Sequence, residues 1–208
     1  AVVSVHALGM DFVGQVVKID DDTISIEVFG NTQDFSLDDI VISFEEKPLA
    51  IPLNEKILGR TFDGLARPID NGGEIYSEKN YSVEGEPLNP VAREYPRDFI
   101  QTGISSIDTL TTLIRGQKLP IFSGYGLSHN QIAAQIVRQA KLKTDEDFAF
   151  VFAAMGIKKD EAMFFEDAFN KAGVRDKVVM YQNLADSPIM ERLIAPVSYT
   201  HLTLPTKA

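Results

Sequence analysis

The 208-residue sequence contains no cysteine. Disulfide bonds and thiolate metal sites are therefore excluded, which fits a cytosolic protein. Histidine is scarce as well, and His6, His129 and His201 lie far apart, so we expect no metal site. Apolar runs long enough to cross a bilayer are also missing, and the mean hydropathy is -0.05.

Positive charge is the minority sign in this chain. Lysine and arginine total 20 against 30 acidic residues, which gives a formal net charge of -10. Such a chain repels a phosphate backbone, so we expect no nucleic-acid partner.

The first 53 residues have the pattern of a small β domain. The stretches "FVGQVVKI" and "TISIEVF" are rich in β-branched and aromatic residues, and Asp20–Asp22 separate them as a hairpin turn would. The strand-like stretches "DIVISF" and "PLAIPL" follow without an intervening helix. Short, closely spaced strands of this kind predict a small barrel or sandwich.

The pattern changes from Asn54 onward. A loop-rich region with many glycines and prolines leads to a short helix in "TGISSIDTLTTL" and to a predicted strand over residues 118–122. A helix over "NQIAAQIVRQAKL" follows, with Ile132, Ile136 and Val137 in its apolar stripe.

Strands and helices continue to alternate in the last third. The continuous apolar run "FAFVFAAM" predicts a strand covered on both faces. The stretch "KDEAMFFEDAFNKAG" predicts an amphipathic helix with Phe165 and Phe169 on one face, and Asp160 and Glu161 in its first turn. The strand "KVVMYQ" and a helix from Ser187 come next. This alternation predicts an α/β domain with a mainly parallel sheet.

The segment between residues 122 and 131, "FSGYGLSHNQ", lies where a phosphate-binding loop would read GxxxxGKS/T. A working loop needs small residues around the phosphates, a lysine for the β- and γ-phosphates, and a hydroxyl for magnesium. Aligned from Ser123, the chain has Ser128 at the second glycine, His129 at the lysine and Asn130 at the hydroxyl. Aligned from Gly124, it has Asn130 at the lysine. Neither register supplies a lysine.

The same residues have a purely structural interpretation. Ser128 to Gln131 reads S-x-x-Q, which is the pattern of a capping box for the helix that follows. On the loop alone, both a capped turn and a weak nucleotide site stay open.

Four blocks carry a closer resemblance: "DGLARPID", residues 96–140, "FAFVFAAMGI" and "NLADSPIMERLIAP". Together they resemble the beta chain, or B subunit, of the V-type and archaeal A-type rotary ATPases over about residues 11–196. In that family the beta chain is the non-catalytic, regulatory component. The "GQKLPIFSG…HN" part is the most specific. One departure is Ala66, where the family usually has glycine, and we expect little effect from it.

The resemblance implies an amino-terminal β-barrel (residues 1–53) and a RecA-like P-loop-type domain (residues 54–196) that is incomplete at its carboxy end. In the family, six subunits form a ring in which catalytic and regulatory copies alternate. The catalytic copy supplies the phosphate loop and a glutamate, and the regulatory copy contributes a second wall and an arginine finger. The finger lies outside this chain. Residues 197–208 do not match the family, so we expect a truncated fragment with an unrelated tail.

A second site agrees with the loop. Catalytic relatives carry a Gly-Glu-Arg motif after the next strand, whose glutamate polarises the attacking water. Here Gly156 matches the glycine, but Ile157 stands in place of the glutamate and cannot act as a base.

We therefore expect no catalytic residue and no metal ligand in this chain. The resemblance implies a degenerate nucleotide interface, with no tightly bound cofactor and with ATP or ADP and magnesium held at the border with the catalytic subunit. Its residues are Ser123, Gly124, Tyr125, Gly126, Ser128, His129 and Asn130, with Ile157 at the lost carboxylate position.

The expected partners are the catalytic A subunit, the central stalk and the peripheral stalk of a proton- or sodium-transporting ATPase. The chain would be cytoplasmic and would meet the membrane only through that complex. The rival interpretations are a self-sufficient P-loop ATPase and another RecA-like assembly protein, such as a flagellar-export or transcription-termination relative.

Overall fold

The computed structural model describes residues 2–30, 32, 34–44, 50–52, 54–77, 80–82, 91, 98–142, 148–189, 191–192 and 194–196. Over these residues the protein is a mixed α/β structure with four separate sheets. The predicted tail, residues 197–208, lies outside the described residues and stays a prediction.

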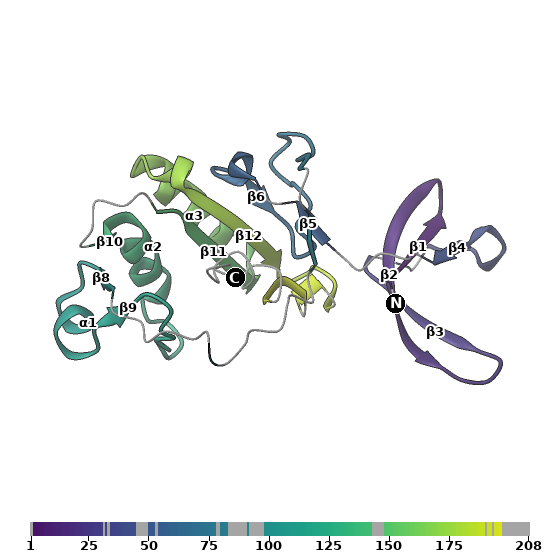
Figure 1. The fold of residues 1–208 in the computed structure, drawn as a ribbon, viewed down its shortest axis with the longest axis horizontal. Helices are drawn as coiled ribbons and strands as arrows, with labels where there is room; N and C mark the ends of the chain where they lie inside the picture. The colour runs from purple at the N-terminus through teal and green to yellow at the C-terminus, as the bar shows by residue number, and fades with distance from the viewer. Residues whose placement is uncertain are drawn as a thin grey trace.

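The amino-terminal sheet is antiparallel and has the strand order β3-β2-β1-β4. Its strands are β1 (Val2–Ala7), β2 (Met10–Ile19), β3 (Ile24–Val28) and β4 (Val41–Phe44). The predicted hairpin is confirmed, because β2 pairs with β3 across the turn at Asp20–Asp22. Figure 1 shows this sheet at one end of the molecule, apart from helices α2 and α3.

One face of this sheet is apolar because side chains alternate along each strand. Val3, Val5 and Ala7 of β1 are buried, whereas Ile42 and Phe44 of the neighbouring β4 share their face and stay about half exposed. Within the described residues the sheet is not closed into a barrel.

The central sheet has the order β11-β12-β6, and both pairings are parallel. Its strands are β11 (Phe150–Ile157), β12 (Val178–Leu184) and β6 (Thr61–Phe62). The mainly parallel sheet predicted from the alternating pattern is therefore confirmed here.

Both faces of the central sheet are covered. Val178 and Met180 point to one face, where they pack with residues of helices α2 (His129–Gln139) and α3 (Lys159–Lys171). Val179 and Tyr181 point to the other face, where Phe62 and Ala66 are their buried partners. The expectation that "FAFVFAAM" is covered on both faces holds, since alternate side chains of β11 join the two clusters.

The predicted helices hold with one adjustment. Helix α3 buries Ala162, Phe165 and Phe169, as its pattern indicates. Helix α2 buries Ala134 and Val137, but Ile132 of the predicted stripe is 37% exposed. The buried stripe is rotated because α2 packs against α3 as well as against the sheet.

The predicted strand over residues 118–122 is wrong. These residues have no regular structure and belong to none of the four sheets. Ile121 is half exposed and Phe122 is 93% exposed. A strand needs a neighbour for its backbone hydrogen bonds, and β11 pairs with β12 rather than with this segment.

Several short elements complete the described fold. Helix α1 (Ser105–Leu110) confirms the short helix predicted in "TGISSIDTLTTL". The chain is also helical at Ile189, Glu191–Arg192 and Ile194–Pro196, after the predicted start at Ser187. The remaining strands are β5 (Ala50–Pro52), β7 (Asn80–Ser82), β8 (Phe99–Gln101), β9 (Leu113–Ile114) and β10 (Lys141–Leu142). The short 3-10 helices are Leu37–Asp39, Glu55–Ile57 and Arg175–Lys177.

Ala66 occupies a backbone conformation that favours glycine. Its φ is 61°, in the left-handed region, where a Cβ costs about 1–2 kcal/mol. Its methyl group is nevertheless buried in the cluster with Phe62 and Tyr181, and a buried methyl group gains roughly 0.8 kcal/mol. The two effects oppose each other, which agrees with the small effect expected for this departure.

Candidate functional site

The loop at residues 123–128 turns outward. Leu127 donates its N–H to the carbonyl of Gly124, and His129 donates its N–H to the carbonyl of Leu127. Gly126 has a φ of +83°, which lets the chain reverse direction there. Tyr125 is fully exposed beside this reversal. The loop therefore presents its side chains to solvent.

The capping box predicted at Ser128 and Gln131 is wrong. Ser128 is the residue before α2, but its side chain makes no capping hydrogen bond. Its ψ of 45° departs from the extended geometry that lets a capping oxygen reach back to the helix. The structure removes the main structural alternative for these polar side chains.

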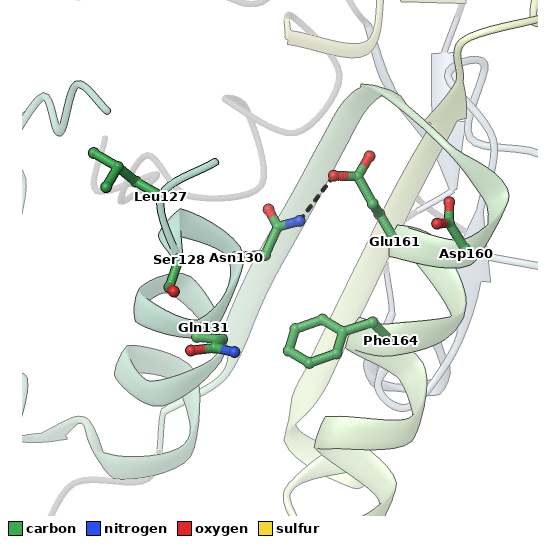
Figure 2. A pocket seen from close by; sticks show the side chains of 7 residues that line it. All are labelled: Leu127, Ser128, Asn130, Gln131, Asp160, Glu161 and Phe164. Atoms are coloured by element: carbon green, nitrogen blue, oxygen red, sulfur yellow. Dashed lines mark hydrogen bonds between the residues drawn. The ribbon is translucent and has the colours of Figure 1, made fainter. Parts of the chain in front are cut away.

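A shallow pocket of about 280 Å³ lies where the first turns of α2 and α3 meet (Figure 2). Of the predicted loop residues, Ser128 and Asn130 line it. Leu127 and Gln131 line the same side, and α3 contributes Asp160, Glu161 and Phe164. Ser123, Gly124, Tyr125, Gly126 and His129 are outside the lining.

One hydrogen bond joins the two helices across this pocket. The Nδ2 of Asn130 donates to Oε1 of Glu161 at 2.9 Å (Figure 2). The other carboxylate oxygen of Glu161 accepts the backbone N–H of Lys158 at 2.9 Å, at the start of α3. Asn130, at the magnesium-ligand position of a working loop, is therefore already engaged by a side chain of its own chain.

The electrostatics of the pocket are acidic. The Lys158 N–H and the Asn130 amide lower the pKa of Glu161, so this carboxylate is charged at neutral pH. Asp160 is a second carboxylate in the lining, and the lining contains no lysine or arginine. The residues present do not fit a triphosphate by themselves, because like charges would face each other without a compensating cation.

Ile157 lies at the end of β11, outside the pocket lining. The pairing of β11 with β12 shifts register between Met155 and Ile157, and Ala185 donates its N–H to the carbonyl of Ile157. The side chain at this position is an aliphatic group, which can neither accept a proton nor polarise water.

No three histidine or acidic side chains among the described residues are grouped so that they could hold a metal ion. In the same part of the chain, no helix combines the length and the apolar character needed to span a bilayer.

The sequence predicts the wall of the pocket that contains Ser128 and Asn130, but not the wall formed by α3. It identifies Asp160 and Glu161 only as first-turn acids of a helix, and it does not single out Phe164. An available signal is the position of these residues just after Ile157, the second family-specific site. Their meeting with Asn130 depends on how α2 packs against α3, which no local pattern encodes.

A family model described as the nucleotide-binding domain of the ATP synthase alpha/beta family matches residues 103–203. The V-type ATP synthase beta chain 2 of Clostridium tetani is 59% identical over 186 residues, which cover 88% of this chain and 40% of that protein. The V-type ATP synthase beta chain of Halothermothrix orenii is 54% identical over 184 residues, with the same two coverages.

The V-type ATP synthase beta chain 2 of Treponema pallidum is also 54% identical over 184 residues, which cover 88% of this chain and 38% of that protein. The chain thus spans about two fifths of the length of the curated relatives that it matches. With more than half of the aligned residues identical over most of its length, the chain belongs to the ATP synthase alpha/beta family, among the V-type ATP synthase beta chains.

Proposed function

We propose that this chain acts as part of the non-catalytic B subunit of a V/A-type rotary ATPase. In this role it alternates with the catalytic A subunits in a ring and couples ATP turnover to proton or sodium transport. The observation that carries the proposal is the composition of the pocket: two carboxylates, a tethered Asn130 and no cation stand where a catalytic subunit needs lysine and a hydroxyl.

The same pocket composition indicates where the nucleotide would bind. ATP or ADP with magnesium binds at the border with the catalytic subunit, whose loop supplies the cation, and this chain contributes a second wall from residues 123–130. The other partners are the central stalk and peripheral stalk subunits. The complex places the chain on the cytoplasmic side, in contact with the membrane only indirectly.

The domain organisation is part of the same proposal. Residues 1–53 form an amino-terminal domain that closes into a barrel in the complete protein, and residues 54–196 belong to a RecA-like domain. Supporting this, β1 to β4 pair only with one another among the described strands, and β6, β11 and β12 form a separate sheet. The half-exposed Ile42 and Phe44 are the side chains that closure would cover.

The purified chain is expected to show no ATP hydrolysis above a buffer control with magnesium and ATP. The double change His129→Lys and Asn130→Thr is expected to leave it inactive, because Ile157 still supplies no base and the pocket keeps two carboxylates. Phosphate release is the measurement. Turnover above about 1 s⁻¹, within the ordinary enzyme range, would contradict the proposal and favour a self-sufficient ATPase.

The exposed loop is expected to face the catalytic subunit. Phe122 and Tyr125 are almost fully exposed, and apolar side chains displayed together are typical of interaction sites. A photo-cross-linking residue in place of Tyr125, in a reconstituted ring of family-length subunits, should yield a product with the catalytic subunit. The same residue in place of Met163, on the outer side of α3, is the comparison position. Products confined to the beta chain itself would refute this orientation.

A further inference from the structure

The turn at residues 70–73 contains an asparagine followed by glycine. Asn71 is the only asparagine in the sequence with a glycine after it. Asn71 and Gly72 are both exposed, and Asn71 has a φ of 57°. Asparagine tolerates this left-handed conformation better than most residues, which explains its place in the turn.

An asparagine–glycine pair can react with itself. The backbone nitrogen of Gly72 loses its proton and bonds to Cγ of Asn71, and the side-chain amide leaves as ammonia. Water then opens the resulting five-membered succinimide at one of its two carbonyls, giving aspartate or isoaspartate. One water enters and one ammonia leaves, so no oxidant or reductant is needed. Glycine favours the reaction because it has no side chain to obstruct the ring.

The fold keeps this glycine for a separate reason. A Cβ added to Gly72 would lie 2.6 Å from Cζ of Arg60. The guanidinium of Arg60 thus packs directly over the Gly72 backbone. A bulkier and slower-reacting residue at this position would displace Arg60.

Arg60 and Asp70 hold the reactive bond from both sides. Arg60 binds the Asp70 carboxylate through Nε and Nη2, and its Nη2 also donates to the carbonyl of Gly73 at 2.8 Å. The Asp70 carboxylate accepts the N–H of Gly72 at 3.0 Å and that of Thr61 at 3.1 Å. Both charged side chains are about four-fifths buried. We call this set the Arg60–Asp70 clamp.

The clamp opposes the reaction. The proton that must leave Gly72 is held in a hydrogen bond to Asp70, and this bond must open before the nitrogen can attack Cγ of Asn71. Asp70 is also a poor base for the reaction, because the Arg60 guanidinium holds the pKa of this carboxyl far below its usual range.

We propose that Asn71–Gly72 is a site of spontaneous deamidation whose rate is set by the Arg60–Asp70 clamp. The closed clamp protects the bond, and while the clamp is open Asn71 can form the succinimide. An isoaspartate adds one backbone carbon and a negative charge beside Asp70, so the clamp does not close again in the same geometry. Openings of the clamp that last long enough for the reaction therefore leave a permanent covalent change in the turn.

The test follows modification at Asn71 during incubation of the 208-residue chain in mildly alkaline buffer. Peptide mass spectrometry detects the exchange of NH2 for OH, and isoaspartyl-specific enzymatic methylation detects the rearranged product. The folded chain should react slowly and the chain in denaturant quickly. Asp70→Asn and Arg60→Lys should each accelerate the reaction about tenfold, since charge-assisted hydrogen bonds are the stronger class.

Two controls separate local opening from general instability. Arg67→Ala weakens a different contact and leaves the clamp intact, so its folded form should react at the wild-type rate. The exposed Asn170–Lys171 bond in the same samples should change little. The comparison of folded with denatured wild-type chain needs no variant. Equal rates in those two states, or no product at Asn71 even in denaturant, would overturn the proposal.

Discussion

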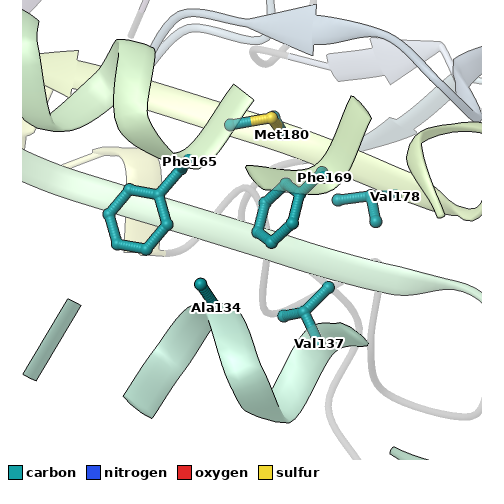
Figure 3. Packing of buried hydrophobic residues seen from close by; sticks show 6 residues of the cluster. All are labelled: Ala134, Val137, Phe165, Phe169, Val178 and Met180. Carbon is teal, nitrogen blue, oxygen red and sulfur yellow. The ribbon is translucent and has the colours of Figure 1, made fainter. Parts of the chain in front are cut away.

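A chain in which alanine replaces Phe169 is expected to lose about 3–5 kcal/mol of its free energy of unfolding. Phe169 is completely buried, and its ring packs edge-on against the ring of Phe152, with 5.2 Å between the two ring centroids. Figure 3 shows it among side chains from α2, α3 and β12. Alanine would leave a cavity bordered by three elements that cannot all move inward, so the neighbouring contacts are lost rather than rearranged.

Met163→Ala on the same helix is the matched control. Met163 is 61% exposed, so its truncation removes little buried area and should cost well under about 1 kcal/mol. Urea denaturation followed by circular dichroism compares the variants. Equal losses for both would show that this cluster is not the core of the domain.

Arg67→Ala is expected to cost about 2 kcal/mol at neutral pH, because it leaves the buried carboxylate of Glu191 without its cation. Arg67 donates to Oδ2 of Asp63 at 2.7 Å and to Oε1 of Glu191 at 3.2 Å. The Glu191 side chain is only 9% exposed, whereas Arg67 is half exposed. Solvent screening of Arg67 keeps the expected loss below that of a fully buried pair.

The stability lost on Arg67→Ala should depend on pH in a definite direction. Burial raises the pKa of Glu191, the charge of Asp63 raises it further, and Arg67 and the Asn183 amide oppose the rise. A carboxyl group whose pKa is raised in the folded state contributes stability that is fully present below its unfolded-state pKa of about 4.3. That contribution is lost as the pH rises through the folded-state pKa. Removing Arg67 raises the pKa of Glu191 further, because Arg67 opposes the rise. The Arg67→Ala deficit should therefore be larger at about pH 7 than at about pH 4.

A second substitution isolates the charge. Glu191→Gln in the Arg67→Ala background should restore part of the lost stability at neutral pH, since no buried carboxylate then lacks a cation. Lys171→Ala, which breaks the exposed contact with Asp167, should cost less than about 0.5 kcal/mol and serves as the comparison. An Arg67→Ala deficit that is independent of pH would contradict the role assigned to Glu191.

The elements that sequence alone predicts well are those whose pattern is long and locally complete. Helix α3 has its acidic first turn and apolar face within one stretch, and β2 and β3 meet across a four-residue turn that contains three aspartates. Such signals need no distant partner. The residues identified by the family resemblance, including Asn130 and Ile157, likewise occur in contiguous motifs.

The errors share a different cause. The segment at residues 118–122 has strand-like composition, but a strand exists only where a neighbour accepts its hydrogen bonds, and none does so in the described fold. The Ser128 cap fails because local backbone angles override a four-letter pattern. The acidic wall of the pocket escapes notice because Glu161 lies 31 positions from Asn130. Pairings across that distance depend on packing.

The place of β6 in the central sheet also bears on how the protein is made. Arg175, just before β12, hydrogen-bonds Thr61 of β6 from 114 positions away, and within the described residues β12 is the one strand that forms a ladder with β6. At ordinary rates of translation, β6 leaves the ribosome on the order of ten seconds before its partner strand exists. During that interval Phe62 and its neighbours have no sheet to join. Newly synthesised chains should therefore depend on a holding chaperone at this stage, and interrupted translation products that end before β12 should be prime substrates for proteases.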